Sequence, residues 1–163
     1  MKFEGFLMQT LKKNDPINNT QVITELRAVC DVIGNLKKSE QDLLKFIILA
    51  NSDFNSSKDY EIHTKGYTNI SKLDFNETFS LLKNTSESLF NLSVDYEYID
   101  ENFLHHEVRF RVIQSFGYAD DKSQVSLCFG FDIIPYIKKI KQFFEEKNDY
   151  DFDEVVQLLL ENS

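Results

Sequence analysis

The spacing of apolar side chains changes period between Val125 and Phe143. The first half alternates, with apolar residues at every second position: Val125, Leu127, Phe129 and Phe131. The second half repeats about every 3.6 residues, through Ile133, Tyr136, Ile137, Ile140 and Phe143 or Phe144. The change predicts a strand that runs directly into a helix. Asp132 is the expected N-cap, and Pro135 fits the first helical turn, where a missing N–H costs little.

Two further helices are predicted in the first fifty residues. The first follows Thr20, ends at Gly34-Asn35, and has the apolar stripe Val22, Leu26, Val29, Cys30 and Ile33. Ser39 is the expected N-cap of the second helix, with Glu40 in the first turn, where a negative charge suits the helix dipole. The second helix ends near Asn51, and its apolar stripe is Leu43, Leu44, Ile47 and Ile48.

A strand and two helices are predicted next. Tyr60 to Thr64 is the strand, and 66–74 holds one helical turn or a short helix. Asp74 or Asn76 caps the longer helix, whose inward residues are Phe75, Phe79, Leu82, Ser86, Leu89 and Phe90. Residues 67–91 together have the size of a helix-turn-helix, although spacing alone favours an ordinary helix pair.

Three strands and a helix complete the pattern. Residues 94–98, 108–116 and 125–131 alternate apolar and polar side chains, which is typical of antiparallel strands with one solvated face. Asp120 to Ser123 form the turn between the last two strands, and Phe152 to Leu160 an amphipathic helix. The fold class predicted is α+β, with about five helices and a three- to four-stranded antiparallel sheet.

Composition agrees with one sizeable domain. The chain has 163 residues, of which 42% are apolar and 15 are Phe, enough to build a core. We expect a single domain with an N-terminal arm and helix (1–35), a central core (36–144) and an acidic C-terminal helix (145–163). No apolar run is long enough for a membrane span, and no signal peptide is evident, so a cytoplasmic location is expected. Cys30 and Cys128 are then reduced and partly buried.

The net charge of −9 is unevenly spread. From residue 142 to the end, seven acids stand against Lys147, which gives −6, and the rest of the chain carries 17 bases against 20 acids, which gives −3. A chain this acidic is a poor autonomous DNA binder, because non-specific affinity comes mainly from phosphate neutralisation.

Enzyme chemistry and metal binding find little support. His105-His106-Glu107 looks like a metal cluster, but neighbouring strand residues point to opposite faces, so the two rings cannot easily share one ion. The chain has no glycine-rich phosphate loop, no Gly-x-Ser-x-Gly elbow and no Cys with an obvious His partner. We therefore expect neither an enzyme nor a metal or cofactor site.

Three stretches resemble a known family. They are Leu36 to Leu44, with its Glu40-Gln41 pair; Tyr60 to Leu92; and Glu107 to Tyr118 followed by Val125 to Phe143, with Ile134-Pro135-Tyr136-Ile137. In this order they resemble the first winged-helix domain of plasmid replication initiator proteins, the Rep family of iteron-type plasmids. The likeness covers roughly Leu36 to Phe143.

The resemblance implies two winged-helix domains in tandem. In that family the second domain reads the iteron, while the first makes the dimer interface and, in monomers, touches the DNA backbone. This chain is expected to end where the second domain would begin, and Phe144 to Asn148 departs from the family's pattern. No base-contacting residue is carried over. The partners implied are a homodimer, duplex DNA of a plasmid origin and a full-length initiator.

Six lysines are candidates for contact with the nucleic-acid backbone: Lys65, Lys72, Lys83, Lys138, Lys139 and Lys141. The alternative is that they only keep the surface soluble. Glu77 and Glu87 lie on the helix that would enter a groove and would meet phosphates with like charge.

Self-association has its own candidates: an unpaired sheet edge and the outer sheet residues Ile99, Arg109, Arg111, Ile113 and Cys128. The alternative is that a terminal helix covers them. The leading hypothesis is an initiator-like protein that controls its monomer and dimer populations. The alternative function is an acidic protein-interaction module or regulator without DNA binding.

Overall fold

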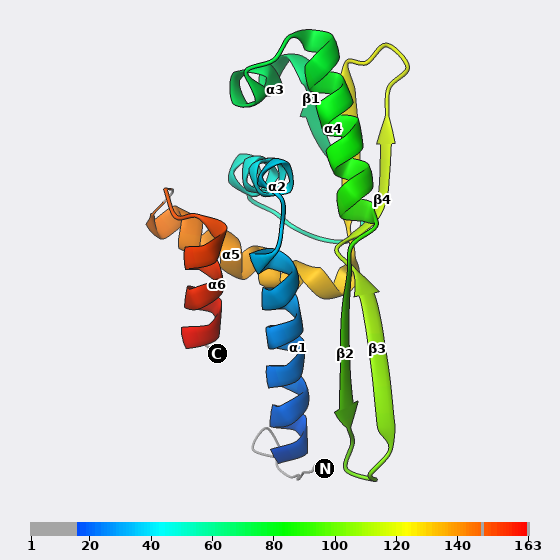
Figure 1. The fold of residues 1–163 in the computed structure, drawn as a ribbon, viewed down its shortest axis with the longest axis vertical. Helices are drawn as coiled ribbons and strands as arrows, with labels where there is room; N and C mark the ends of the chain where they lie inside the picture. The colour runs from blue at the N-terminus through cyan, green and yellow to red at the C-terminus, as the bar shows by residue number, and fades with distance from the viewer. Residues whose placement is uncertain (1–15, 148, 163) are drawn as a thin grey trace. The chain divides into compact units, whose positions relative to one another are not determined.

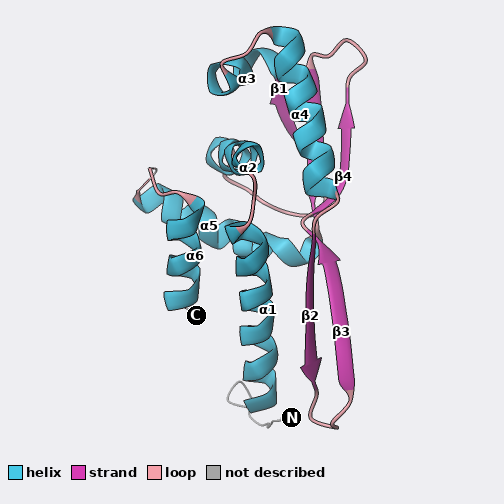
Figure 2. Ribbon diagram, in the orientation of Figure 1, coloured by secondary structure: helices cyan, strands magenta, loops and turns pink. Residues whose placement is uncertain are grey.

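The computed structural model describes residues 16–147 and 149–162, which form six α-helices, one 3₁₀ turn and five strands (Figures 1 and 2). In chain order these are α1 (Pro16–Gly34), α2 (Lys38–Ala50), β1 (Tyr60–His63), α3 (Thr64–Ser71), α4 (Phe75–Phe90), β2 (Ser93–Ile99), β3 (His105–Arg111), β4 (Ile113–Tyr118), β5 (Gln124–Phe129), η1 (Phe131–Ile133), α5 (Ile134–Glu146) and α6 (Phe152–Glu161). The predicted α+β class is confirmed. The predicted N-terminal arm lies outside the described residues.

The chain forms two compact units. One comprises the described parts of 1–35, 93–110 and 156–163, and the other comprises 36–92 and the described parts of 111–155. The expectation of a single domain with divisions near residues 35 and 144 stays a prediction.

The larger unit is built on a three-stranded antiparallel sheet in the order β1-β5-β4. Leu127, in the centre of β5, lies opposite Tyr60 on β1 and Phe116 on β4. Helices α3 and α4 pack on this sheet, and α2 packs on α4 and α5. Its largest fully buried side chains include Tyr60, Phe129, Phe144, Leu43, Ile47, Ile48, Ile62, Leu82, Leu89, Ile113 and Leu127. The predicted apolar stripe of α2 is therefore confirmed in full.

A buried carboxylate fixes the start of α2. The N-cap is Lys37 rather than the predicted Ser39. The Lys37 backbone N–H donates to Glu40 Oε1 at 2.8 Å, and the Ser88 hydroxyl of α4 donates to Glu40 Oε2. Glu40 is almost fully buried, and a buried charge needs such partners. Helix α2 therefore begins at Lys38, where Glu40 in the first turn can accept the hydrogen bond from the Lys37 N–H.

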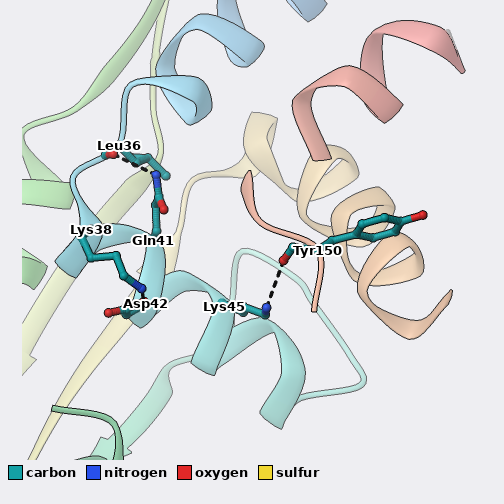
Figure 3. Close-up of polar contacts among 6 residues, drawn as sticks. All are labelled: Leu36, Lys38, Gln41, Asp42, Lys45 and Tyr150. Carbon is teal, nitrogen blue, oxygen red and sulfur yellow. Dashed lines mark hydrogen bonds and ion pairs between the residues drawn. The ribbon is translucent and has the colours of Figure 1, made fainter. Parts of the chain in front are cut away.

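The polar side of α2 is committed to contacts within the larger unit (Figure 3). Lys45 Nζ donates to the Tyr150 carbonyl at 3.0 Å, and Lys38 pairs with Asp42 one turn along. The Gln41 side chain donates to the Leu36 carbonyl at 3.1 Å. The contact from Lys45 anchors the segment between α5 and α6. On either side of this segment, Phe144 of α5 and Phe152 of α6 meet edge to face.

The strand-to-helix junction is confirmed, with two corrections. Phe131, the last apolar residue of the predicted strand, is 75% exposed, because β5 ends at Phe129 and η1 begins at Phe131. Asp132 lies inside η1 and does not cap α5, whose N-cap is Ile133. Pro135 sits at the start of α5, as predicted. The other inward residues of this helix are buried, except that Tyr136 is half-buried.

The predicted strand 108–116 is wrong as a single element. It is divided at Val112 into β3, which pairs with β2, and β4, which pairs with β5. Gly130 N–H donates to the Val112 carbonyl at 3.0 Å, and the β4–β5 register shifts between Ile113 and Ser115. An irregularity of this kind redirects a strand, and here the consecutive apolar residues Val112 and Ile113 interrupt the alternation.

The smaller unit packs α1 against the β2–β3 hairpin (Figure 1). Most of the predicted stripe of α1 is buried, namely Leu26, Val29, Cys30 and Ile33. Val22 is 63% exposed, so its prediction was wrong. The Tyr96 hydroxyl donates to Glu25 Oε2 at 3.0 Å, and burial, with Glu25 beside it, raises the pKa of Tyr96 to about 12.

Both cysteines are free and buried. Burial, with the nearby charge of Asp31, raises the pKa of the Cys30 thiol, which keeps it protonated at neutral pH. Among residues 16–147 and 149–162, no helix combines the length and apolar character that a membrane crossing requires.

Gly130 is a position where the fold requires glycine. A Cβ there would lie 2.2 Å from the Arg111 carbonyl oxygen, whereas a Cβ on Gly66 would meet nothing within 4 Å. We expect Gly130→Ala to lower the free energy of unfolding by about 1–3 kcal/mol, the usual cost of overpacking. Gly66→Ala, in α3, should raise it by about 0.5–1 kcal/mol. Urea denaturation measures both, and a Gly130→Ala protein as stable as wild type would contradict the close approach.

Candidate nucleic-acid interface

Helices α3 and α4 occupy the place of a helix-turn-helix, where spacing alone had favoured an ordinary helix pair. Lys72 ends α3 in the left-handed conformation (φ 62°), and its N–H donates to the Thr68 carbonyl at 2.9 Å. Asp74 is the N-cap of α4, one of the two residues predicted, and its Oδ1 accepts the Glu77 N–H at 2.8 Å. Phe75 is exposed, contrary to prediction, because it occupies the first position of α4, ahead of the turn that packs on the sheet.

Strands β4 and β5 form a wing whose turn is the predicted Asp120 to Ser123. Lys122 has φ 64° and closes the turn by donating its N–H to the Ala119 carbonyl at 3.0 Å. Thr64 joins this turn to α3: its N–H donates to the Ser123 carbonyl at 2.9 Å and its hydroxyl to the Lys122 carbonyl at 2.6 Å. The wing tip and the start of α3 are thereby held as one piece.

Thr64 was not singled out in the sequence analysis. It is fully buried, and its hydroxyl has a partner 58 positions along the chain, which no local pattern reveals. The sequence did offer one signal: Thr64 is a small hydroxyl residue at the junction of a predicted strand and a predicted helix, where such residues often form hydrogen bonds to the backbone.

Three of the six candidate lysines are exposed: Lys65, Lys72 and Lys138. Lys65 and Lys72 lie at the two ends of α3, so both belong to the helix-turn-helix and its junction with the wing. Lys138 lies on α5, on the exposed face of the helix and away from the buried Ile137 and Ile140.

The other three candidate lysines are engaged with neighbouring groups. Lys83 Nζ lies 4.5 Å from the ring centroid of Tyr118 on β4, and Lys139 Nζ lies 5.8 Å from that of Phe143. Lys141 donates to the Ile48 carbonyl at 3.3 Å and has a side chain only 16% exposed. The α5 lysines therefore do not share one exposed face. The DNA role of all six stays a prediction.

The outer face of the β2–β3 hairpin carries cross-strand charge pairs. Arg109 Nε donates to Asp95 Oδ1 at 2.6 Å, and His105 pairs with Glu97. His106 instead pairs with Asp100 at 2.7 Å and stacks on Tyr98, with ring centroids 4.7 Å apart. The two histidines therefore have separate carboxylate partners. Among the described residues, no group of three or more His, Cys, Asp or Glu side chains is placed to hold a metal ion.

The candidates for self-association are divided by burial. Ile113 and Cys128 are buried, so a partner cannot reach them, and Cys128 contacts the Ser56 carbonyl in the loop before β1. Arg111 is exposed but engaged: it donates to the Phe90 carbonyl at 2.6 Å and lies 4.1 Å from the Phe90 ring centroid. Arg109 is paired on the hairpin, and Ile99, at its tip, is 51% exposed.

Comparison with known proteins identifies the family. A sequence model described as "Initiator Replication protein, WH1" matches residues 22–159. The chain belongs to this family. No curated protein sequence matches it.

Two solved structures share the fold. One is the X-ray structure of the MSBI1.176 WH1 domain, a replication protein isolated from a multiple sclerosis patient. It has 22% identity and a TM-score of 0.63, over 76% of this chain and 96% of that one. The other is the Pi initiator protein in complex with iteron DNA. It has 18% identity and a TM-score of 0.50, over 70% of this chain and 47% of that one. The initiator WH1 family and its winged-helix fold, predicted from the sequence, are confirmed.

The tip of the WH1 hairpin depends on Asp100. Its Oδ1 accepts the N–H groups of Asn102 and Leu104 at 2.8 and 3.0 Å, and its Oδ2 meets His106. The His106 hydrogen bond, together with those two amides, holds the pKa of Asp100 below its ordinary value. A lowered pKa means that the carboxylate stabilises the folded tip above its unfolded pKa and ceases to do so as pH falls through the folded value.

We therefore expect Asp100→Ala to lower amide-exchange protection at residues 102 and 104. In wild type, the same protection should fall only as pH drops below about 4, near the ordinary aspartate pKa. Hydrogen exchange followed by NMR measures both effects. Asp95→Ala, which removes one exposed ion pair from the same hairpin, is the control. Equal losses in the two variants would contradict the special role of Asp100.

Proposed function

We propose that this chain acts in replication initiation at a plasmid origin as a self-associating WH1 domain that also touches the DNA backbone. Membership of the initiator family over residues 22–159 carries the proposal. Its partners would be a second copy, duplex DNA and a full-length initiator, and its role would be binding rather than catalysis. The cytoplasm, where plasmid DNA is accessible, is the proposed location.

The β2–β3 hairpin is the surface that best supports self-association. Among the described residues its two strands pair only with each other, so both outer edges keep unpaired backbone groups. Its tip exposes Ile99 and Leu104, which are 51% and 60% exposed. Exposed apolar residues beside an open strand edge are a common basis for association.

Hairpin variants test this surface. We expect Ile99→Lys combined with Leu104→Lys to weaken self-association at least tenfold, because two charges would replace apolar contact area. Ile70→Lys with Leu73→Lys is the control, since these α3–α4 residues are similarly exposed, at 45% and 41%. Sedimentation velocity over a concentration series gives the dissociation constants. A wild type that stays monomeric at high concentration, or equal losses in both variants, would count against the hairpin.

The exposed lysines of α3 support contact with phosphates. Lys65 and Lys72 lie at the two ends of α3, which Thr64 ties to the wing. Such contacts release counterions, so affinity falls with salt in proportion to the phosphates neutralised. The chain's acidity means that this contact is weak and acts together with self-association.

Binding to a random-sequence duplex across a salt series tests the contact. We expect Lys65→Ala and Lys72→Ala each to reduce the slope of log K against log salt by about 0.9, the loss of one phosphate contact. Lys147→Ala, at the end of α5, is the control with the same charge change. No binding at low salt, together with a stable dimer, would instead favour the acidic protein-interaction module.

A further inference from the structure

Helix α4 presents one continuous polar stripe to solvent. The exposed positions recur every three or four residues and therefore share a face: Glu77, Ser80, Asn84, Glu87 and Asn91. The opposite face, with Phe79, Leu82 and Leu89, is buried in the core. In a winged helix docked on DNA through this helix, the exposed stripe would have to enter the groove.

The stripe carries negative charge without a compensating cation. Glu77 and Glu87 are both exposed, and no ion pair involves either within the described residues. Lys83, the one lysine in α4, lies one turn before Glu87, but it is half-buried and its Nζ lies 4.5 Å from the Tyr118 ring centroid. A groove lined by phosphates would therefore meet two carboxylates and no ammonium group.

The N-terminus of α4 is also closed to phosphate. Free N–H groups at a helix N-terminus bind anions, but here the Asp74 carboxylate accepts the Glu77 N–H at 2.8 Å. The Thr78 N–H donates to the Asp74 carbonyl at 2.9 Å. A DNA phosphate arriving at this end would meet the protein's own carboxylate.

The wing does not compensate. Its turn exposes Asp120 and Asp121 against Lys122, which leaves it negative. Hydrogen bonds from the Ser123 side chain and from the Ser123 N–H, which lies 3.0 Å from Asp121 Oδ1, hold the pKa of Asp121 below its ordinary value, so it stays charged at neutral pH. Both elements that a winged helix usually sets against DNA are thus acidic in this chain.

We propose that Glu77 and Glu87, with the N-cap Asp74, keep α4 out of the DNA groove, so that this domain does not read bases through its helix-turn-helix. The inference deepens the proposed function and rests on it, since it restricts DNA contact to surfaces other than the α4 stripe. Specificity then has to come from a partner or from a different surface.

Charge reversal on the stripe tests the proposal. We expect Glu77→Lys with Glu87→Lys to tighten binding to a random-sequence duplex at least tenfold more than the control Glu146→Lys with Asp153→Lys. Both pairs change the net charge by +4 at exposed positions. The slope of log K against log salt should steepen by about 2 only in the stripe variant, because two new phosphate contacts form. The neutral pair Glu77→Gln with Glu87→Gln should give a smaller gain, which guards against a folding effect of the lysines.

A reporter on the stripe gives a second readout. Asn84→Cys, in the middle of the stripe, can be labelled with an environment-sensitive dye, because Cys30 and Cys128 are buried. We expect duplex DNA to change the dye signal in the charge-reversed protein and not in the otherwise wild-type protein.

Three results would overturn the proposal: equal gains in the stripe and control variants, no gain in either, or a DNA-dependent dye signal without charge reversal. A wild type that fails to bind DNA would count against the proposed backbone contact alone. The comparison between the two double variants would still decide the role of α4.

Discussion

The pairing of β5 with strands on both of its sides is the interaction on which the larger unit depends. Leu127 has Tyr60 on one side and Phe116 on the other, so one strand sets the register of the other two. Since a shift of one residue would turn every side chain to the opposite face, this register also decides which residues form the core. The wing, the anchoring of α3 through Thr64 and the start of α5 all follow from the position of β5.

Periodicity in the sequence predicted the helices and most of the core because it depends on local geometry. Leu43, Ile47 and Leu82 are buried where their spacing placed them. The division of the strand at Val112 was missed. The consecutive apolar residues Val112 and Ile113 interrupt the alternation there, but they do not reveal that the pairing partner changes. Exposure at the ends of elements was also missed. Phe131 is exposed because it lies after the end of the strand β5 and before the helix α5 begins.

The candidate site was predicted at the level of elements and less well at the level of side chains. The two helices, the Asp74 cap of the second and the wing turn were all readable from short segments. What each lysine does depends on groups distant in sequence, such as the Ile48 carbonyl that binds Lys141 and the Tyr118 ring beneath Lys83. A list of basic residues therefore overstates the exposed cationic surface of this WH1 domain.

The order of the strands along the chain has a consequence for biosynthesis. β1 is made more than sixty residues before β5, the only strand with which it pairs among the described residues. Until the ribosome has released β5, Tyr60 and Ile62 have no sheet in which to be buried, and the nascent segment exposes an apolar strand with open hydrogen-bonding groups. Contacts of such long sequence separation slow folding, so this interval is when the polypeptide is most exposed to aggregation and to chaperones.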